Sequence, residues 1–246
     1  MIPWLRRKSA GARFLILFPG RTGSSWLVDG LCRHPRIRAD GEILVGRSPD
    51  EQRSTLRRLY AGRRTRSAIG FKTKLKDVAD LDLLRSCIVE NELIVFLMRR
   101  RDLLRLAISR INARRLHAET GRWNVRASDR AVSGADVAVE ELVDALIQCR
   151  DDVLRLDDFI ASSGVVPCEI EYADILEDPD GVLAMVQQVL GVEHRPLASS
   201  VVKNTNQDLA AAVGNIEMLR RELASSEWSS VFDVDPISER RSSREG

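Results

Sequence analysis

The sequence predicts an α/β fold in which a parallel β-sheet is flanked by helices on both faces. Short apolar runs alternate with helical patterns along the chain, and strands that are buried on both faces typically have such continuous apolar runs. With 246 residues, of which 44% are hydrophobic, the chain can bury one substantial core. We therefore expect a single domain over residues 1–246, with a core from about 12 to 226 and a polar tail from about 229 to 246.

Four apolar runs predict the strands of this sheet. They lie at Phe14–Phe18, Ala68–Lys72, Leu93–Met98 and Cys168–Tyr172. The third run, LIVFLM, is the clearest, because it is apolar, β-branched or aromatic throughout and has charged residues on both sides.

Helical patterns separate these runs. We expect helices at Ser24–Arg33, Asp102 to about Leu116, about Val139–Leu154, Asp178–Gly191 and Leu209–Leu223. The first ends before Pro35, which disfavours helix in the residue that precedes it. Residues 47–67 show only weak helical pieces, and the Gly-, Ser- and Arg-rich residues 117–135 predict a loop or lid.

Charge is distributed unevenly along the chain. Residues 1–123 carry 27 Lys and Arg against 12 Asp and Glu, whereas residues 124–246 carry 11 against 24. A basic half suits nucleic acid, an acidic membrane surface or a small polyanion in a cleft. Arginine dominates the cations, 33 to 5, which suits forked recognition of phosphate or sulfate oxygens, although a GC-rich genome explains the total equally well.

The cysteines and the apolar runs bear on the cellular location of the protein. The four cysteines form no C-x-x-C pair, so we expect neither a zinc site nor a disulfide framework, and a reduced, cytoplasmic location is the simpler interpretation. The longest apolar run near the N-terminus, Phe14–Phe18, is too short to span a bilayer.

The loop between the first strand and the first helix carries the strongest functional signal. Ligands of open parallel sheets collect beyond the carboxyl ends of the strands, where a helix start offers free backbone N–H groups. Gly20 and Gly23 permit a tight backbone path. Polar side chains surround the same point, namely those of Arg21, Thr22, Ser24 and Ser25. The loop therefore predicts an anion site; the alternative is a tight turn with Ser24 or Ser25 as N-cap.

This loop is not a Walker loop. A Walker loop reads G-x-x-x-x-G-K-[ST], with a lysine just before the hydroxyl residue that holds Mg²⁺. Here the glycines are three residues apart and no lysine lies between Thr22 and Ser25. The pattern indicates a phosphate-binding loop that lacks the lysine typical of loops that bind a nucleotide together with Mg²⁺.

The stretch FPGRTGSSWL, Phe18–Leu27, resembles the 5′-phosphosulfate-binding loop of sulfotransferases that use 3′-phosphoadenosine 5′-phosphosulfate (PAPS). The family's second signature is an Arg at a strand end followed eight residues later by a Ser, which together hold the 3′-phosphate. Arg101 and Ser109 match that spacing, with Arg99 and Arg100 as alternatives to Arg101. The resemblance implies a P-loop-like sulfotransferase fold with the following donor-binding residues: Arg21, Thr22, Gly23, Ser24, Ser25, Arg101 and Ser109.

Three weaker matches extend the resemblance over residues 14–225. RHPRIRADGEIL, Arg33–Leu44, is similar to a segment of bacterial carbohydrate sulfotransferases of the trehalose sulfotransferase type. Residues 171–192 resemble a structural stretch in the family's C-terminal half. VVKNTNQDL falls where family members close a basic loop over the nucleotide, so Lys203 and Asn204 are candidates there, with an exposed turn as the alternative.

The resemblance implies in-line transfer of a sulfuryl group from PAPS to an acceptor hydroxyl, with adenosine 3′,5′-bisphosphate as the product and no metal required. Arg21 would stabilise the leaving group, and Lys72 would lie beside the sulfuryl group. Glu42 is the candidate base, with a histidine as the alternative. The histidines are His34, which fits a helix end better than a catalytic role, His117 and His194.

The sequence indicates the acceptor less specifically than the donor. A carbohydrate or glycolipid hydroxyl is expected, with other small-molecule, glycan or lipid acceptors left open, as are peripheral membrane proximity through the acceptor and a homodimer. Nucleic acid is not expected, because aromatic residues make up only 5% of the chain. The alternative functions are a non-catalytic PAPS- or nucleotide-binding relative and a P-loop-type nucleotide kinase.

Overall fold

The computed structural model of this chain describes residues 11–61, 67–123, 134–201 and 209–233. They form two compact units, which are described separately. The first unit comprises Met1–Arg99 and Asp152–Ser200, and the second comprises Arg100–Asp151 and Val201–Gly246. The single domain expected from the sequence stays a prediction.

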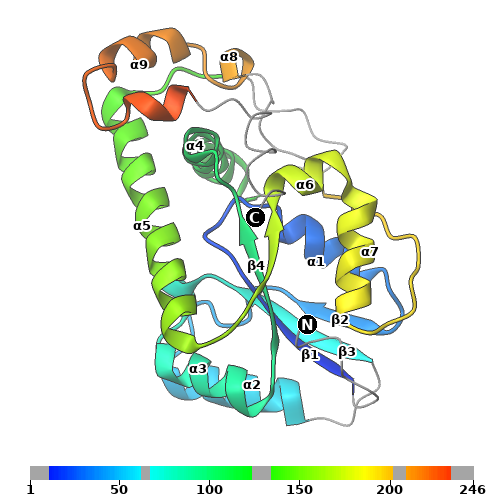
Figure 1. Ribbon diagram of the computed structural model, residues 1–246. Helices are drawn as coiled ribbons and strands as arrows, with labels where there is room; N and C mark the ends of the chain where they lie inside the picture. Colours follow the sequence, from blue (N-terminus) through cyan, green and yellow to red (C-terminus); the bar gives the residue numbers. More distant parts are fainter. Residues whose placement is uncertain (1–10, 62–66, 124–133, 202–208, 234–246) are drawn as a thin grey trace. The chain divides into compact units, whose positions relative to one another are not determined.

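The first unit is built on a parallel sheet, as predicted, with five strands instead of the four that the apolar runs indicated (Figure 1). Its strands are β1 (Ala12–Leu17), β2 (Ile37–Asp40), β3 (Ala68–Thr73), β4 (Ile94–Arg99) and β5 (Cys168–Glu171). Their order is β2-β3-β1-β4-β5, so β1 lies in the middle. In this register Leu17 of β1 lies opposite Thr73 of β3, which places the carboxyl ends of these strands side by side.

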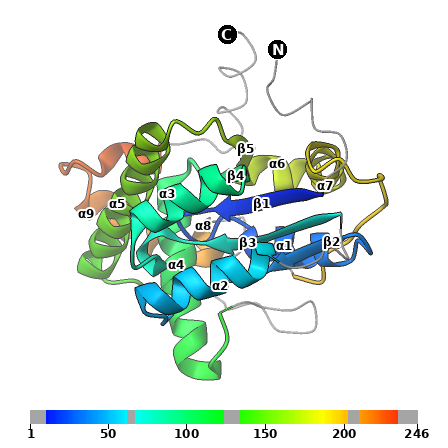
Figure 2. The same ribbon diagram turned by 90° about the horizontal axis from the view of Figure 1, so that it is seen from below.

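Helices cover both faces of this sheet, also as predicted. They are α1 (Ser24–Cys32), α2 (Pro49–Ala61), α3 (Leu81–Glu90), α6 (Tyr172–Glu177), α7 (Pro179–Val189) and the second half of α5 (Val139–Ser163), with a 3₁₀ turn η2 (Leu75–Asp77). Successive strand residues point to opposite faces. Phe14 and Ile16 accordingly pack with α1, α6 and α7, whereas Leu15 and Leu17 pack with α2, α3 and α5. Figure 2 shows α2 and α3 nearest to the viewer.

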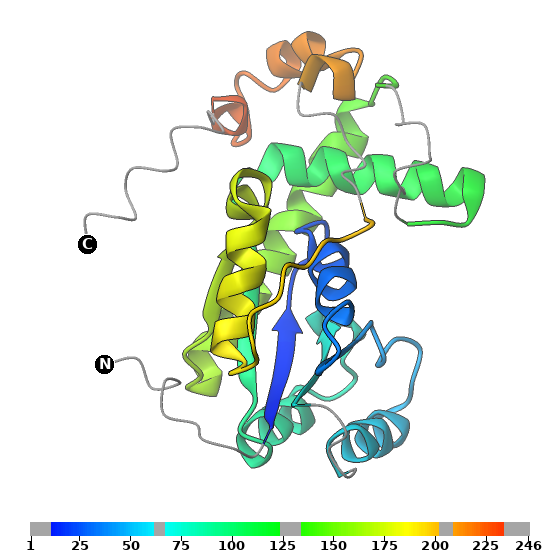
Figure 3. The same cartoon turned by 90° about the vertical axis from the view of Figure 1, so that its right-hand side faces the viewer.

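The strand–loop–helix unit at the centre of the sheet places the candidate anion loop. Figure 3 shows β1 leading upward into this loop, from which α1 returns alongside the strand. The α1 side chains of Leu27 and Leu31 are fully buried against the sheet. The loop at residues 18–23 is therefore held from both ends by core packing.

The second unit is helical in the residues described. It contains α4 (Leu103–Thr120), the first half of α5, α8 (Leu209–Ala212), α9 (Ile216–Glu222) and a 3₁₀ turn η3 (Ser229–Phe232). Its core joins apolar residues of α4 and α5 with Leu219, Trp228 and Phe232. The turn η3, with Phe232 buried, occupies the place where the sequence indicated the start of a polar tail.

Three of the predicted element boundaries are wrong. The helix expected over about Val139–Leu154 continues to Ser163 as α5. The single helix expected over Leu209–Leu223 is broken between α8 and α9, because the Asn215 side chain accepts a hydrogen bond from Val137 N at 3.0 Å and donates one to Val137 O at 2.9 Å. The loop expected from residue 117 begins later, because α4 continues to Thr120 and ends at Gly121, whose φ of 69° is left-handed.

The sequence interpretation also missed β2 and α3. The four residues of β2 alternate between buried and more exposed positions at an edge of the sheet, so no apolar run marks them. The start of α3 carries a clear signal in retrospect, because the Asp80 side chain caps it by accepting from the N–H groups of Asp82 and Leu83.

In the part of the chain that the structure describes, no helix combines the length and the apolar character needed to cross a membrane.

Candidate functional site

The loop after β1 has an unusual backbone. Gly20, Arg21 and Gly23 all have left-handed conformations, with φ of 103°, 57° and 81°. Glycine adopts this region freely, but for Arg21 it costs about 1 kcal/mol. Residues held in such conformations concentrate at functional sites, where the surrounding structure maintains the strain.

The start of α1 is arranged for an anion. Its N-cap is Gly23, not Ser24 or Ser25, and this N-cap makes no side-chain hydrogen bond. The first turn contains no acidic residue. The N–H groups of a first helical turn lack intrahelical partners and favour negative charge. The capping role considered for the serines is therefore wrong, and the electrostatics of this helix end suit an anion.

Gly23 is required at this position for a second reason. A Cβ atom added there would lie 3.1 Å from Ile175 Cδ1 and 3.3 Å from the Tyr172 ring. The left-handed backbone and the close approach of α6 both favour glycine.

Thr22 supplies a buried hydroxyl beside this helix start. Its side chain is fully buried, and among the described residues its Oγ1 atom has no hydrogen-bond partner. A buried hydroxyl without a partner costs about 1–3 kcal/mol. An oxygen of a bound anion would remove that cost, so Thr22 fits a ligand-binding role.

Lys72 connects the loop to the neighbouring strand. It is the penultimate residue of β3, and strand alternation directs its side chain to the α1 face, opposite to that of Phe71. Its Nζ atom lies 2.8 Å from Ser25 Oγ and 3.3 Å from Ser24 Oγ. The structure therefore brings together three residues that the sequence singled out.

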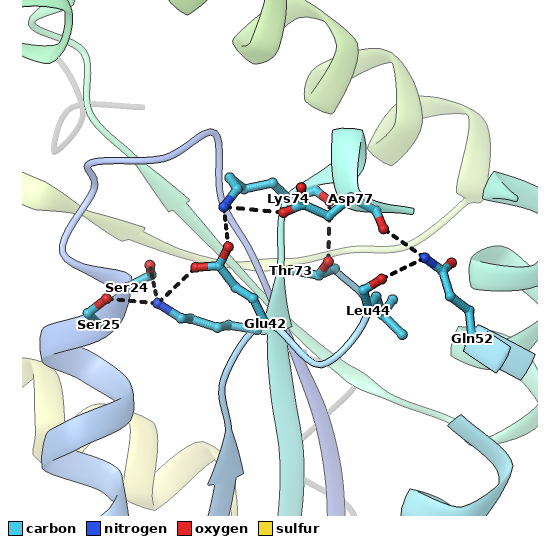
Figure 4. Close-up of polar contacts among 9 residues, drawn as sticks. Ser24, Ser25, Glu42, Leu44, Gln52, Thr73, Lys74 and Asp77 are labelled. Carbon is cyan, nitrogen blue, oxygen red and sulfur yellow. Dashed lines mark hydrogen bonds and ion pairs between the residues drawn. The ribbon is translucent and has the colours of Figure 1, made fainter. Parts of the chain in front are cut away.

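Glu42 joins this group from the segment after β2 (Figure 4). Its Oε1 atom lies 3.4 Å from Lys72 Nζ, and its Oε2 atom is paired with Lys74. Lys74 also forms an ion pair with Asp77 Oδ2 at 3.2 Å. Both ammonium groups lie over the Phe18 ring, 5.1 and 5.5 Å from its centroid. We call Glu42, Lys72, Lys74 and Asp77 the charge cluster.

The pKa values of Glu42 and Lys72 are both shifted within the charge cluster. Burial alone would raise the pKa of Glu42, but the hydrogen bond from Lys74 and the charge of Lys72 outweigh it, so this pKa lies below its ordinary value of 4.5. Burial also lowers the pKa of Lys72, and the Glu42 carboxylate only partly offsets this while the charges of Lys74 and Arg21 add to it. Glu42 is therefore a firmly ionised carboxylate at neutral pH.

Gln52 of α2 holds the two segments of the charge cluster together (Figure 4). Its Nε2 atom donates to Leu44 O at 2.9 Å and to Asp77 O at 2.8 Å. Its Oε1 atom accepts from Ala79 N at 3.0 Å. One buried amide thus ties the segment of Glu42 to the segment of Lys74.

The sequence interpretation missed Lys74 and Gln52. A signal for Lys74 was present, because it follows Lys72 by two residues, and such residues share a face where a strand conformation continues. Gln52 carried no comparable signal, since one amide in a polar helix is indistinguishable by sequence from its exposed neighbours.

The candidate residues for the 3′-phosphate lie in the second unit. Arg101 precedes the N-cap of α4, Asp102, and Ser109 is buried within that helix. Arg99, the alternative that lies in the first unit, is paired with Asp157 of α5 at 2.7 Å and with Glu169 of β5 at 3.1 Å, so its charge is already balanced there. Lys203 and Asn204 lie outside the described residues.

Two of the alternative bases have contacts within their own units. His34 is fully buried; its Nδ1 atom accepts from Arg36 N at 3.1 Å, so its Nε2 atom donates to Glu193 O at 2.9 Å. These bonds give it the structural role that its position at a helix end suggested. His117, in the second unit, stacks on Trp123 with the ring centroids 4.0 Å apart.

Comparison with known proteins gives a result at the level of structure. No protein-family model matches the sequence, and no curated protein matches it either. Among solved structures, a sulfotransferase from Alicyclobacillus acidocaldarius is similar with a TM-score of 0.53 and 16% identity, covering 88% of this chain and 91% of that one.

Two further solved structures are more distant. Mouse sulfotransferase SULT7A1 complexed with PAP gives a TM-score of 0.46 at 12% identity, covering 78% of this chain and 62% of that one. The sulfotransferase domain of the Synechococcus PCC 7002 olefin synthase gives 0.43 at 14% identity, covering 76% of each chain. The Alicyclobacillus match establishes the fold: this chain has the α/β fold seen in a sulfotransferase.

The role of Gln52 predicts a stability effect. Gln52→Met keeps the length of the side chain but leaves Leu44 O, Asp77 O and Ala79 N without their partner. We expect the free energy of unfolding to fall by about 3 kcal/mol, measured by urea denaturation. Arg53→Ala, at the exposed neighbouring position of α2, is the control and should change it little. Equal values for the two variants would contradict the role of Gln52.

The ion pairs of Glu42 predict a pH dependence of stability. Because the pKa of Glu42 is lowered on folding, its contribution is present above pH 4.5 and is lost as the pH falls through the folded-state pKa. Glu42→Gln should therefore be less stable than the wild type at neutral pH, and the difference should shrink on acidification. Urea denaturation across this range measures it, with the exposed Glu90→Gln as control. A difference that does not change with pH would exclude this linkage.

Proposed function

We propose that this protein is a sulfotransferase that moves a sulfuryl group from PAPS to a hydroxyl of an acceptor, which we take to be a carbohydrate or glycolipid. One observation carries the proposal: Lys72 joins the hydroxyls of Ser24 and Ser25, at the anion-binding start of α1, to the Glu42 carboxylate. A cation and a base thus adjoin an anion cradle that lacks the Walker lysine. The similarity of fold to a sulfotransferase supports the same function.

The loop after β1 fits the 5′-phosphosulfate of PAPS. The backbone of α1 at Ser24 and Ser25, the buried hydroxyl of Thr22 and the charge of Arg21 would hold its oxygens. The left-handed conformation of Gly23 shapes the start of this cradle. When bound, PAPS supplies the sulfuryl group, and adenosine 3′,5′-bisphosphate leaves.

Glu42 would serve as the base in this reaction. Its carboxylate takes the proton of the acceptor hydroxyl while that oxygen forms its bond to sulfur and the bond to the leaving phosphate oxygen breaks with its electron pair. Lys72 and Lys74 keep this carboxylate ionised and fixed in orientation. Arg21 and Lys72 would balance the negative charge that grows on the leaving oxygen.

The resemblance in sequence supports the remaining assignments. Arg101 and Ser109 would bind the 3′-phosphate of PAPS, and Lys203 and Asn204 would close over the nucleotide. No metal ion has a role in this proposal, because a transferred sulfuryl group carries less negative charge than a phosphoryl group.

A labelling experiment tests the function and the base together. The protein is incubated with ³⁵S-labelled PAPS and an extract of its host, and the labelled product is identified. We expect a labelled sulfate ester, and Glu42→Gln should reduce the rate by about 10²- to 10⁴-fold with little change in the Kd for adenosine 3′,5′-bisphosphate. The exposed Glu90→Gln is the matched control.

The other outcomes of this experiment separate the alternatives. Nucleotide binding without any labelled product would indicate a non-catalytic relative. Transfer from ATP with Mg²⁺, but not from PAPS, would indicate a nucleotide kinase. A Glu42→Gln variant with the wild-type rate would move the base elsewhere, and His117 would be tested next.

The assignment of the 3′-phosphate predicts a difference between two nucleotides. Arg101→Ala and Ser109→Ala should each weaken binding of adenosine 3′,5′-bisphosphate by about tenfold, because a hydrogen bond to a charged group is lost. They should hardly affect adenosine 5′-phosphate, which lacks the 3′-phosphate. Isothermal titration measures both affinities, and equal losses for the two nucleotides would refute the assignment.

A further inference from the structure

A pocket opens in the first unit beside the charge cluster. It is small, with room for little more than one water molecule, and is lined by Phe18, Pro19, Lys74, Leu75, Lys76, Asp152, Arg155 and Leu156. These residues come from the start of the anion loop, from η2 with the residue before it, and from α5. We call it the Lys76 pocket.

The wall of the Lys76 pocket is partly apolar. Phe18, Leu75 and Leu156 are all buried and belong to the packing of the sheet. Lys74 is the one lining residue that also belongs to the charge cluster, where it is paired with Glu42. A molecule in this pocket therefore lies next to the pair that contains the proposed base.

Two cations of the pocket have no partner within the described residues. Lys76 and Arg155 are exposed, and neither forms a hydrogen bond or an ion pair with another residue that the structure describes. The other cation, Lys74, is balanced by Glu42 and Asp77. Asp152 supplies the single lining carboxylate, so the lining retains an excess of positive charge.

These observations point to a negatively charged group on the ligand. Lys76 and Arg155, two cations on different segments, favour such a group, and the small pocket has room for the group rather than for the whole molecule. The anion cradle proposed for PAPS begins after Pro19, at residues 20–25, so the pocket adjoins the cradle without including its binding residues.

We propose that the acceptor of this enzyme is anionic, and that Lys76 and Arg155 bind its carboxylate, sulfate or phosphate group in the Lys76 pocket. This inference rests on the proposed function, since it assumes that the acceptor hydroxyl is directed to Glu42. It narrows the acceptor from any carbohydrate or glycolipid to one that carries a negative charge near the hydroxyl.

Binding of matched glycosides tests the inference without the need for turnover. The probes are p-nitrophenyl β-D-glucoside, its 6-phosphate, and p-nitrophenyl β-D-glucuronide, titrated into the full chain loaded with adenosine 3′,5′-bisphosphate and followed by NMR. We expect the two anionic probes to bind about tenfold more tightly than the neutral one, and added salt to remove the difference. Unequal binding of the two anionic probes would distinguish a carboxylate from a phosphate ligand.

Variants connect the selectivity to the two cations. Lys76→Ala with Arg155→Ala should reduce the affinity for the anionic probes to that for the neutral one, whereas Lys76→Arg with Arg155→Lys should retain the selectivity. Arg57→Ala, an exposed arginine of α2 outside the pocket, is the control. Thermal unfolding checks that each variant folds.

The outcomes that overturn the inference are distinct from those that overturn the function. Equal binding of charged and neutral probes, no binding of the charged probes up to their solubility, or selectivity that survives in the double alanine variant would each refute it. Loss of adenosine 3′,5′-bisphosphate affinity in that variant would show that the two cations serve the donor instead. Failure of the wild type to bind this nucleotide would contradict the proposed function, and probe selectivity would then be measured in the nucleotide-free protein.

Discussion

The buried ammonium group of Lys72 is the constraint on which the candidate site depends. Its side chain is only 8% exposed, and a charge removed from water must be paired and hydrogen-bonded. The partners come from two other segments: the hydroxyls of Ser24 and Ser25 at the start of α1, and the Glu42 carboxylate after β2. Satisfying this one cation therefore fixes the anion loop, the end of β3 and the segment of Glu42 relative to one another.

The strand order makes this arrangement available. Because β2, β3 and β1 are adjacent and parallel, the segments after all three emerge at one edge of the sheet. Gln52 then holds the segments after β2 and β3 together, through its bonds to Leu44 O and Asp77 O. Local backbone strain at Arg21, and a Thr22 hydroxyl without a partner among the described residues, persist at this edge because the surrounding packing holds them.

Much of this edge could be predicted from the sequence because its signals are local. Apolar runs marked β1, β3, β4 and β5, and the spacing of glycine and hydroxyl residues marked the loop. The features that could not be predicted from the sequence depend on tertiary contacts. Glu42 and Lys74 are 32 residues apart, and only strand pairing brings them together. The break before α9 likewise depends on the bonds between Asn215 and Val137, which helical periodicity does not reveal.

The two lysines beside Glu42 raise a question about basicity, because they lower the pKa of the carboxylate that is proposed to accept a proton. A base with a low pKa is a weak one when proton transfer must activate the nucleophile early. Sulfuryl transfer through a loose transition state requires a less basic carboxylate, since the bond from the incoming oxygen to sulfur is little formed in that state. The hydroxyl becomes strongly acidic only as that bond completes, and an ionised carboxylate held in place is then sufficient. The lysines thus favour orientation and charge balance over basicity, which suits sulfuryl transfer.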